Sequence, residues 1–344
     1  MNTKEQTRML WKTCFDDDDD FVELYFNMRY QDETNQVIVE DGRVVSALQM
    51  IPYPMTFCGE LIPMSYISGA CTLPDYRRRG LMRRLLKQTH RAMYEQGVLL
   101  ATLIPAEDWL MNYYALEGYA TCFNYALKVI NSNEYPVDNY KTNLFISKID
   151  LQKPVSPSVY TFFNEQMNRR SCCVQHSLED LEVVLADLRL AGGDLWTARE
   201  GGELTGMAFC IPQNGTLSVK EMLFADSMDE PAMLAHILHA CSLAEAECIV
   251  PSEDAAEELG MARFIDIAAC LQLFARSESG KGLDFDIQIE GDDAIPENNG
   301  YYSLSGGELY RGFTQGKTYR LMTVHQLTAW VMSRLYPYMS LMLN

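Results

Sequence analysis

Residues 70–84 read ACTLPDYRRRGLMRR. They end a predicted strand over Met64–Thr72, turn at Pro74–Arg79 and enter a helix predicted over Leu81–Gln96, where large side chains recur with helical spacing. The first N–H groups of a helix have no intrahelical partner, and with the helix dipole they favour an anion. Gly80 lets the backbone approach a phosphate that a Cβ would obstruct. This segment is therefore predicted to bind a pyrophosphate group.

The distribution of charge supports a polyanion site at this helix. The chain has 344 residues, with 28 Lys and Arg against 47 Asp and Glu, a net charge of −19. A charge this negative disfavours general binding to nucleic acid or anionic membrane, so neither partner is expected, and it suits an amine-bearing, cationic small molecule. Seven cations nevertheless gather within fifteen positions, at Arg77, Arg78, Arg79, Arg83, Arg84, Lys87 and Arg91.

The order of predicted elements indicates an α+β fold. Up to about position 125 the chain reads as a helix, several antiparallel strands, and then helix, strand, helix and strand, with hairpin turns at Asp41-Gly42 and Cys58-Gly59. From Val159 a shortened form of this order recurs, with helices predicted over Leu178–Leu190 and Pro231–Ala246. From about Met261 the pattern changes to alternating strands and a last helix over Thr323–Tyr336. This length allows two or three domains.

The spacing of residues 77–82 resembles motif A, R-x-x-G-x-G/A, of the GNAT (Gcn5-related N-acetyltransferase) superfamily, although Met82 replaces the small residue. The longer run TLPDYRRRGLMR is similar to the Eis-like (enhanced intracellular survival) subgroup. The resemblance implies an N-acetyltransferase with acetyl-coenzyme A as acyl donor. It also implies that the backbone of Ala70, Cys71 and Thr72 pairs with the pantetheine arm. The implied phosphate-binding residues are Arg77, Arg78, Arg79, Gly80, Leu81, Met82 and Arg83.

A second match lies at residues 114–119, which read YALEGY and resemble the family's Y-x-x-x-G-Y/F segment. The resemblance implies that Tyr114 and Ala115 also contact the acyl donor. It further implies that Tyr119 is the general acid that protonates the departing thiolate. A tyrosine with its ordinary pKa of about 10 is protonated at neutral pH and can donate. The alternative is a tyrosine that only packs in the core.

The resemblance extends over nearly the whole chain and implies two tandem GNAT-type modules followed by a sterol-carrier-protein-like domain. The expected boundaries are 1–145 for a catalytic module, 146–258 for a degenerate module and 259–344 for the third domain. The second module lacks motif A, because residues 225–231 read ADSMDEP, with three carboxylates and no glycine. Carboxylates would repel a pyrophosphate, so we expect this module to bind no acyl donor.

In the Eis-like subgroup the chain's own terminal carboxylate reaches back into the first module and accepts the proton of the substrate ammonium. The resemblance assigns this role to Asn344. The apolar run over Met339–Leu343 can anchor such a tail in the interior, and a frayed terminus is the alternative.

The remaining features suggest a reduced, cytoplasmic protein without membrane insertion. Ten cysteines form no C-x-x-C pair, and the sequence has no apolar leader and no apolar run long enough to span a membrane. His236 and His239 share a helical face without a third ligand nearby, so no metal site is expected. Cys71 is expected to fill the core, and His90 to lie at the surface or beside the phosphates.

Several alternatives stay open at this point. The acceptor could be a polyamine, an aminoglycoside, a lysine side chain or a peptide N-terminus. The five carboxylates of Asp16–Asp20 are either a solvated helix start or an attraction for a cationic substrate. The rival function is a non-catalytic coenzyme A- or lipid-binding protein that uses the third domain. A homo-oligomer is also open, because the subgroup includes oligomers.

Overall fold

Two sheets organise the chain in this computed structural model, which describes residues 1–133, 143–252 and 257–343. The strands of the larger sheet are β1 (Asn35–Glu40), β2 (Arg43–Phe57), β3 (Glu60–Thr72), β4 (Leu100–Leu103), β5 (Ala120–Asn131), β6 (Phe145–Lys148), β7 (Cys173–Val174), β8 (Asp194–Glu200), β9 (Glu203–Gln213), β10 (Thr216–Phe224), β11 (Glu245–Pro251) and β12 (Glu257–Phe264). Their order is β1-β2-β3-β4-β12-β5-β11-β10-β9-β8-β6, and β7 pairs with β2.

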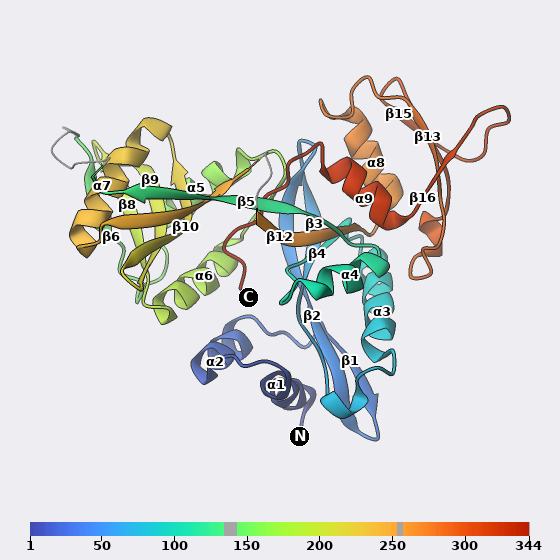
Figure 1. Ribbon diagram of the computed structural model, residues 1–344, viewed down its shortest axis with the longest axis horizontal. Helices are drawn as coiled ribbons and strands as arrows, with labels where there is room; N and C mark the ends of the chain where they lie inside the picture. The colour runs from blue at the N-terminus through green and yellow to red at the C-terminus, as the bar shows by residue number, and fades with distance from the viewer. Residues whose placement is uncertain (134–142, 253–256, 344) are drawn as a thin grey trace.

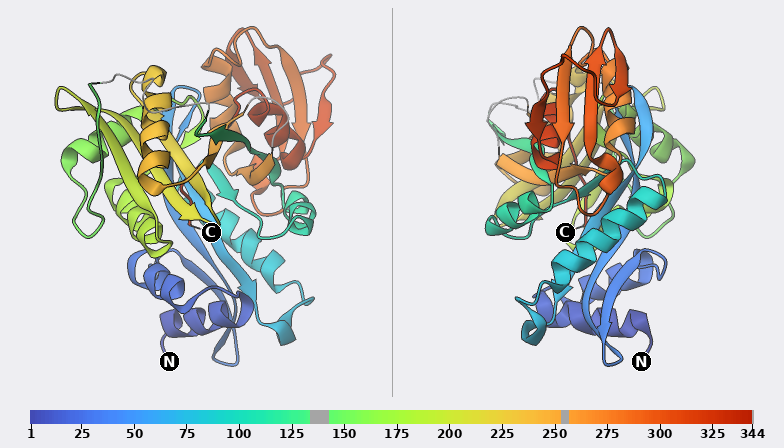
Figure 2. Two further views of the ribbon diagram at one scale, coloured as in Figure 1. Left: turned by 60° about the vertical axis from the view of Figure 1, so that its left-hand side comes forward. Right: turned by 90° about the vertical axis from the view of Figure 1, so that its right-hand side faces the viewer.

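The smaller sheet has the order β15-β14-β13-β16 and stands at the end of the molecule away from the first two helices (Figure 2). Its strands are β13 (Phe285–Ile289), β14 (Gly300–Ser305), β15 (Glu308–Arg311) and β16 (Arg320–Met322). The helices are α1 (Thr3–Cys14), α2 (Asp19–Met28), α3 (Leu81–Glu95), α4 (Trp109–Leu116), α5 (Pro157–Asn168), α6 (Leu178–Leu190), α7 (Glu230–Cys241), α8 (Ile267–Arg276) and α9 (Val324–Met332). Among the described residues, no helix combines the length and apolar character needed to cross a membrane.

Helix α1 packs against a bulged part of β3. Its start is fixed by a capping box, in which the Asn2 side chain accepts from the Glu5 N–H and Glu5 accepts from the Asn2 N–H. Opposite it, the register between β2 and β3 shifts between the pairs Ala47–Cys71 and Gln49–Ser68. Gly69 lies in this bulge with φ of +59°, and a Cβ there would sit 2.1 Å from the Trp11 ring. Glycine is therefore required at Gly69 both by the backbone and by the packing of α1.

Strands β3 and β4 pair over a short distance and then separate. The parallel register covers three pairs, from Met64–Leu100 to Tyr66–Thr102. Strand β3 continues to Thr72, whereas β4 ends at Leu103, just before Ile104 and Pro105. In the described part of the chain, no strand pairs with this edge of β3 beyond Tyr66.

Strand β5 joins the two halves of the large sheet (Figure 1). One half contains β1 to β4 and β12, and the other contains β11, β10, β9, β8 and β6. Its first half, Ala120–Tyr125, pairs with β12, and its second half, Tyr125–Asn131, pairs with β11. Strand β12 also pairs with β4, so a segment far along the sequence completes the sheet that β1 to β5 begin. The sequence-based boundary between residues 258 and 259 falls inside β12.

The C-terminal layer shares a hydrophobic core with the first half of the molecule. Phe274 on α8 and Leu327 on α9 belong to the same buried cluster as Phe57 on β2 and Phe264 on β12. A buried ion pair adds to this contact, because Arg263 of β12 donates to both carboxylate oxygens of Asp292, at 2.7 and 2.8 Å. The layer is therefore tied to β12 by both packing and charge.

Two predicted helices end earlier in the structure than expected. The helix predicted over Pro231–Ala246 stops at Cys241, because Ser242 adopts a left-handed conformation with φ of +55°, and β11 then begins at Glu245. The last helix starts at the Thr323 capping box, as expected, but ends at Met332. The predicted end, Tyr336, has φ of +46° and cannot continue a right-handed helix.

Removing the Asp292 carboxylate should strongly destabilise the fold. Asp292→Ala leaves the Arg263 guanidinium buried without its counter-charge, which typically costs about 3–5 kcal/mol. Urea unfolding of the variant should show this loss. The matched control is Glu278→Gln, which removes the exposed ion pair with Lys281 and should change the free energy of unfolding little. Equal stability of the two variants would contradict a structural role for the buried pair.

Candidate active site

The turn before α3 has the backbone geometry of an anion-binding loop. Arg78 and Gly80 adopt left-handed conformations, with φ of +62° and +74°, and α3 begins directly after them at Leu81. Gly80 precedes the helix without a side-chain cap, and the first helical hydrogen bond runs from the Arg84 N–H to the Gly80 carbonyl at 3.0 Å. The N–H groups of Leu81, Met82 and Arg83 are thus available to an anion. A Cβ at Gly80 would meet no protein atom within 4 Å, so its open side faces space that a ligand can fill.

The arginines around this loop divide into paired and unpaired groups. Arg77 donates from Nε to the Thr72 carbonyl at 3.1 Å, and Arg79 donates to Glu40 at 3.1 Å. Arg83 forms an ion pair with Glu117 at 2.8 Å. The described residues give Arg78 and Arg84 no ion pair or side-chain hydrogen bond. Arg78 and Arg84 are therefore the cations of this helix start that a polyanion can engage without first breaking an ion pair or a side-chain hydrogen bond.

The predicted pantetheine-binding residues lie along the unpaired edge of β3. Cys71 and Thr72 pair with β2 on the opposite edge, and Ala70 lies in the bulge between them and Ser68. Cys71 is buried, as expected of a core thiol. Cys14, at the end of α1, donates from Sγ to the Thr72 carbonyl at 3.4 Å. Hydrogen bonding with Cys71 and the nearby Arg77 guanidinium lower the pKa of the Cys14 thiol to about 6.

Tyr119 lies in the interior, immediately before β5. Its ring packs edge-on against Tyr114 at 5.8 Å, and its hydroxyl is hydrogen-bonded to Nε2 of His90 at 2.9 Å. Both side chains are fully buried, and burial raises the pKa of Tyr119 above its ordinary value.

The expectation that His90 lies at the surface or beside the phosphates is wrong. His90 shares the buried face of α3 with Leu86 and Met93, a placement that the helical spacing could have shown.

The structure requires a glycine at position 118, directly before Tyr119. Its φ is +92°, and a Cβ there would lie 2.1 Å from an Nη atom of Arg263. That guanidinium donates to the Glu117 carbonyl at 2.7 Å. The glycine therefore admits the buried arginine of β12 beside the tyrosine. Ala115, on the helix before it, is partly buried and lines a cavity with Arg83 and Glu117.

Tyr119 and the C-terminal tail lie on opposite faces of the sheet. Successive residues of a strand point to opposite faces, and Met261 and Ala262 of β12 belong to two different buried clusters. Tyr119 lies in the cluster with Met261 and with Leu85 on α3, whereas Met339 and Leu343 of the tail lie in the cluster with Ala262. The unpaired edge of β3 separates these two environments.

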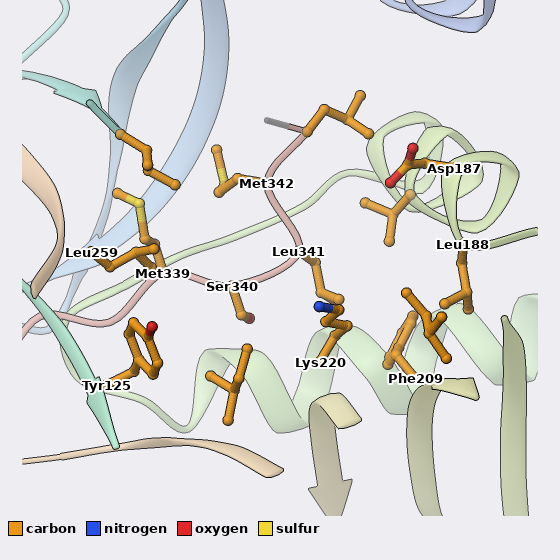
Figure 3. Close-up of a pocket in the computed structure, with 15 residues that line it drawn as sticks. Tyr125, Asp187, Leu188, Phe209, Lys220, Leu259, Met339, Ser340, Leu341 and Met342 are labelled. Carbon is orange, nitrogen blue, oxygen red and sulfur yellow. The ribbon is translucent and has the colours of Figure 1, made fainter. Parts of the chain in front are cut away.

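The tail enters the interior between the two halves of the molecule, as its apolar composition predicts (Figure 3). The Tyr338 N–H donates to the Cys172 carbonyl, and the Val174 N–H donates to the Tyr338 carbonyl. Met339 and Leu343 are buried. The predicted catalytic residue Asn344 lies outside the described residues.

The tail lines a cavity of about 250 Å³ that sequence reasoning missed. Its walls are Ile104 after β4, Tyr125 on β5, Leu259 on β12, and residues of α6, β9 and β10 (Figure 3). Two charged side chains line it, Asp187 of α6 and Lys220 of β10. Burial raises the pKa of Asp187, and Lys220 partly opposes this. No local sequence signal marks this cavity, because segments far apart in the sequence form it.

Asp187 also lines a hollow with the five carboxylates around the start of α2. Asp16–Asp20 line a hollow together with Asp187, Leu190 and Ala191 at the end of α6. The two halves of the molecule thus form an acidic surface beside the tail cavity. The part of the chain that the structure describes contains no group of three or more His, Cys, Asp or Glu side chains placed to hold a metal ion.

Comparison with known proteins identifies a family for the first third of the chain. Residues 2–122 match the family described as "Acetyltransferase (GNAT) domain". These residues are a GNAT domain. The expected enzyme class, an acyltransferase, is confirmed for this domain, and domains of this family use acetyl-coenzyme A.

The GNAT domain has a relative in Streptomyces avermitilis, named "Uncharacterized N-acetyltransferase". The two sequences are 32% identical over 106 residues, which is 30% of this chain and 23% of the relative. The match thus spans less than a quarter of the relative's length.

Two solved structures share the fold over nearly the whole chain. A protein of unknown function from Enterococcus faecalis, titled a probable N-acyltransferase, superposes with a TM-score of 0.75 at 18% identity and covers 98% of this chain and 96% of its own. Eis1 from Mycobacterium abscessus superposes with a TM-score of 0.73 at 16% identity, covering 95% of this chain and 86% of its own. At these identities the likeness shows a common mixed α/β, GNAT-like fold.

Gly80→Glu should abolish binding of coenzyme A, because it places bulk and negative charge where the loop admits a phosphate. A thermal-shift titration with millimolar coenzyme A measures this. At about 100 times its dissociation constant, a ligand stabilises the native state by about 2.7 kcal/mol. The matched control is Gly215→Glu in the β9–β10 turn, which has a similar φ of +82° and equally open surroundings. An equal shift in both variants would contradict the assignment of the loop.

Lowering the pH should destabilise the fold around the C-terminal tail, because the buried His176 side chain becomes protonated. This buried imidazole lies 3.3 Å from the Leu341 carbonyl, and burial lowers its pKa to about 4 from 6.5. The unfolded chain therefore binds a proton at a higher pH than the folded chain. The contribution of the neutral His176 to the free energy of unfolding is fully present above about pH 6.5. It falls by about 3 kcal/mol as the pH drops towards 4.

The pH dependence of urea unfolding tests this effect. His176→Asn should have a flatter profile than wild type over that range. Profiles of the same slope in the two proteins would show that His176 does not contribute.

Proposed function

We propose that the chain is an acetyl-coenzyme A-dependent N-acetyltransferase that acts on a primary amine. The observation that carries this proposal is the continuity of two features of the GNAT domain. The unpaired edge of β3 leads directly into the left-handed turn at Arg78 and Gly80, which opens α3. A ligand that combines an extended amide-bearing arm with a pyrophosphate matches both features.

In this proposal the acyl donor lies along β3 with its phosphates at the start of α3. Backbone groups of Ala70, Cys71 and Thr72 hold the pantetheine arm, and the N–H groups of Leu81, Met82 and Arg83 hold the phosphates. Arg78 and Arg84 add positive charge without losing an existing ion pair. The bound thioester supplies an activated acetyl group, and the protein's contribution is to orient it and to stabilise charge on its carbonyl oxygen.

Tyr119 is proposed as the general acid. It lies on the α3 face, whereas the tail lies on the opposite face, so the two flank the unpaired edge from different sides. An amine can then approach from the tail side while the sulfur is protonated from the α3 side.

The acceptor is proposed to be a small cationic molecule, or the lysine side chain or N-terminus of a peptide. Support comes from the acidic hollow of Asp16–Asp20 and Asp187, which adjoins the tail cavity. Such a surface concentrates cations near the entrance. Lys220 lines the tail cavity and would repel a second positive charge of the acceptor in that cavity. The far end of the acceptor, with any second charge, would therefore lie in the acidic hollow.

The base is proposed, by resemblance, to be the carboxylate of Asn344. The buried course of the tail to Leu343 supports this, because it carries the chain into the cavity between the modules. Asp187 is the side-chain carboxylate that lines the same cavity and is the alternative base. Its raised pKa makes it a stronger base than an ordinary aspartate.

The wider organisation is also proposed from the resemblance. Residues 1–145 would be the catalytic module, with β12 as an added strand, and residues 146–258 a second module that binds no acyl donor. The layer over residues 259–344 would be sterol-carrier-like. A cytoplasmic enzyme is consistent with the ten cysteines, which are all free thiols.

Release of free thiol from acetyl-coenzyme A across a panel of amines tests the proposed function. The panel should contain a polyamine, an aminoglycoside, a lysine peptide and a peptide blocked at its side chains. Thiol release that depends on an amine, with the acetylated amine found by mass spectrometry, is the expected result. Coenzyme A binding without transfer to any amine would favour the rival, non-catalytic function.

Tyr119→Phe should lower kcat by about 10²- to 10⁴-fold, because it deletes the donated proton and little else. The KM for acetyl-coenzyme A should stay nearly unchanged, since the loop is intact. Steady-state kinetics with a good acceptor separates these effects. A change in KM alone would mean that Tyr119 binds substrate and that another group protonates the thiolate.

The tail role predicts sensitivity to changes at Asn344. Deleting Leu343 and Asn344 withdraws the carboxylate by up to about 7 Å, at about 3.3–3.6 Å per extended residue. A C-terminal tag converts the carboxylate to an amide and adds bulk. Both changes should reduce turnover strongly while coenzyme A binding survives. If untagged, tagged and truncated proteins turn over equally at saturating donor, Asp187 becomes the better candidate for the base.

A further inference from the structure

The Tyr119 hydroxyl has one side-chain partner in the described structure, the imidazole of His90. The two heavy atoms are 2.9 Å apart, and the rings are tilted with centroids 5.5 Å apart. His90 projects from α3, the helix that directly follows the anion loop. The pair therefore links the proposed acid to the same rigid element that holds the phosphates.

Charged and titratable groups face this pair from three other elements. Arg263 on β12 acts on both side chains, disfavouring a charged imidazole and favouring a charged phenolate. Tyr114 and Glu117 face Tyr119 from the end of α4 and have the opposite effect on the phenolate. His325 on α9 contacts the backbone carbonyl of Tyr119 through Nδ1, at 2.5 Å. Asp292 pairs with Arg263 and so limits its effect.

This environment presents a difficulty for a general acid. A fully buried tyrosine holds its proton more tightly than one in water, because the phenolate that remains is poorly solvated. The proton can be given up readily only if a donor is already placed to stabilise the phenolate. A tyrosine whose own O–H is directed at His90 would also have no proton pointing at the sulfur.

We propose that His90 is a positioning residue that donates its Nε2–H to the Tyr119 oxygen, which directs the phenol proton to the departing sulfur and stabilises the phenolate that forms. This inference rests on the proposed acetyl transfer. The amine nitrogen forms a bond to the acetyl carbon, and the carbon–sulfur bond breaks. The electron pair of the broken bond stays on sulfur, which takes the phenol proton. The amine loses one proton on the other face, and the phenolate regains one from solvent.

Two observations fit this role of His90. Burial, together with Arg263, keeps the pKa of His90 well below its ordinary value, so the imidazole is neutral and carries a single N–H. His90 also lines a cavity of about 410 Å³ between α3, the Gly118 turn and the C-terminal layer. The imidazole thus contacts both the buried hydroxyl and a space that water can enter, which provides a route for returning the proton.

Kinetics of His90 variants test this role. His90→Phe should reduce kcat by roughly 10- to 100-fold, the range expected when a hydrogen bond to a charged group is lost, with the KM for acetyl-coenzyme A unchanged. His90→Gln keeps an N–H donor near the same position and should recover much of kcat. Thr89→Val is the matched control. It alters the neighbouring buried side chain of α3, which bonds to the Leu85 carbonyl, and should leave kcat unchanged.

A double-mutant cycle separates positioning from a general effect on folding. In the Tyr119→Phe background, His90→Phe should cause no further loss of kcat, because the hydroxyl it supports is absent. Nitrogen-15 NMR of the imidazole in the wild-type protein should show a neutral ring protonated at Nε2. That measurement needs no turnover.

Three results would overturn the inference. They are an unchanged kcat in a folded His90→Phe variant, losses that multiply in the double mutant, and an imidazole protonated at Nδ1 alone. Poor recovery in His90→Gln together with low thermal stability of both variants would show a structural role instead. A wild-type protein that acetylates no amine refutes the proposed function itself and is seen before any variant is compared.

Discussion

Strands β3 and β4 pair over three residues and then part, and the chemistry proposed for this chain depends on that separation. Three local features produce it. The bulge at Gly69 redirects β3 under the Trp11 ring, β4 ends after four residues, and β12 occupies the other edge of β4. A backbone edge without a strand partner is normally a liability in a protein. Here the edge runs into the anion loop at Gly80, so a ligand with amide groups and phosphates can satisfy both.

The second half of the molecule contributes to the proposed site, although it does not form this edge. Strand β5 pairs with β12 and then with β11, so the two halves of the large sheet are hydrogen-bonded through one strand. The tail is held between them by Cys172 and Val174 next to β2. The second half also contributes side chains to this region, because α6 and β10 supply Asp187 and Lys220 to the cavity that the tail lines.

The elements near motif A could be predicted from sequence because local rules determine them. The helix after Gly80 and the hairpins at Asp41-Gly42 and Cys58-Gly59 follow from spacing and turn chemistry, and the structure has them within a few residues. Helix α1 is absent from the elements predicted above, although Asn2 and Glu5 have the spacing of a capping box. The insertion of β12 between β4 and β5 could not be predicted, because both partners lie far from β12 in the sequence. The sequence of a strand does not show which other strand it pairs with. The same limit hid the contact between His90 and Tyr119.

Hydrogen exchange measured with and without acetyl-coenzyme A shows whether the donor binds along the unpaired edge of β3, because it reports on the backbone and does not depend on turnover. Added donor should slow exchange of amides within residues 67–72 of β3 and residues 80–83 at the start of α3. The corresponding segment of the second module, residues 225–231, should be unaffected. Protection of residues 225–231, or no change along β3 under conditions where the donor binds, would contradict this placement of the donor.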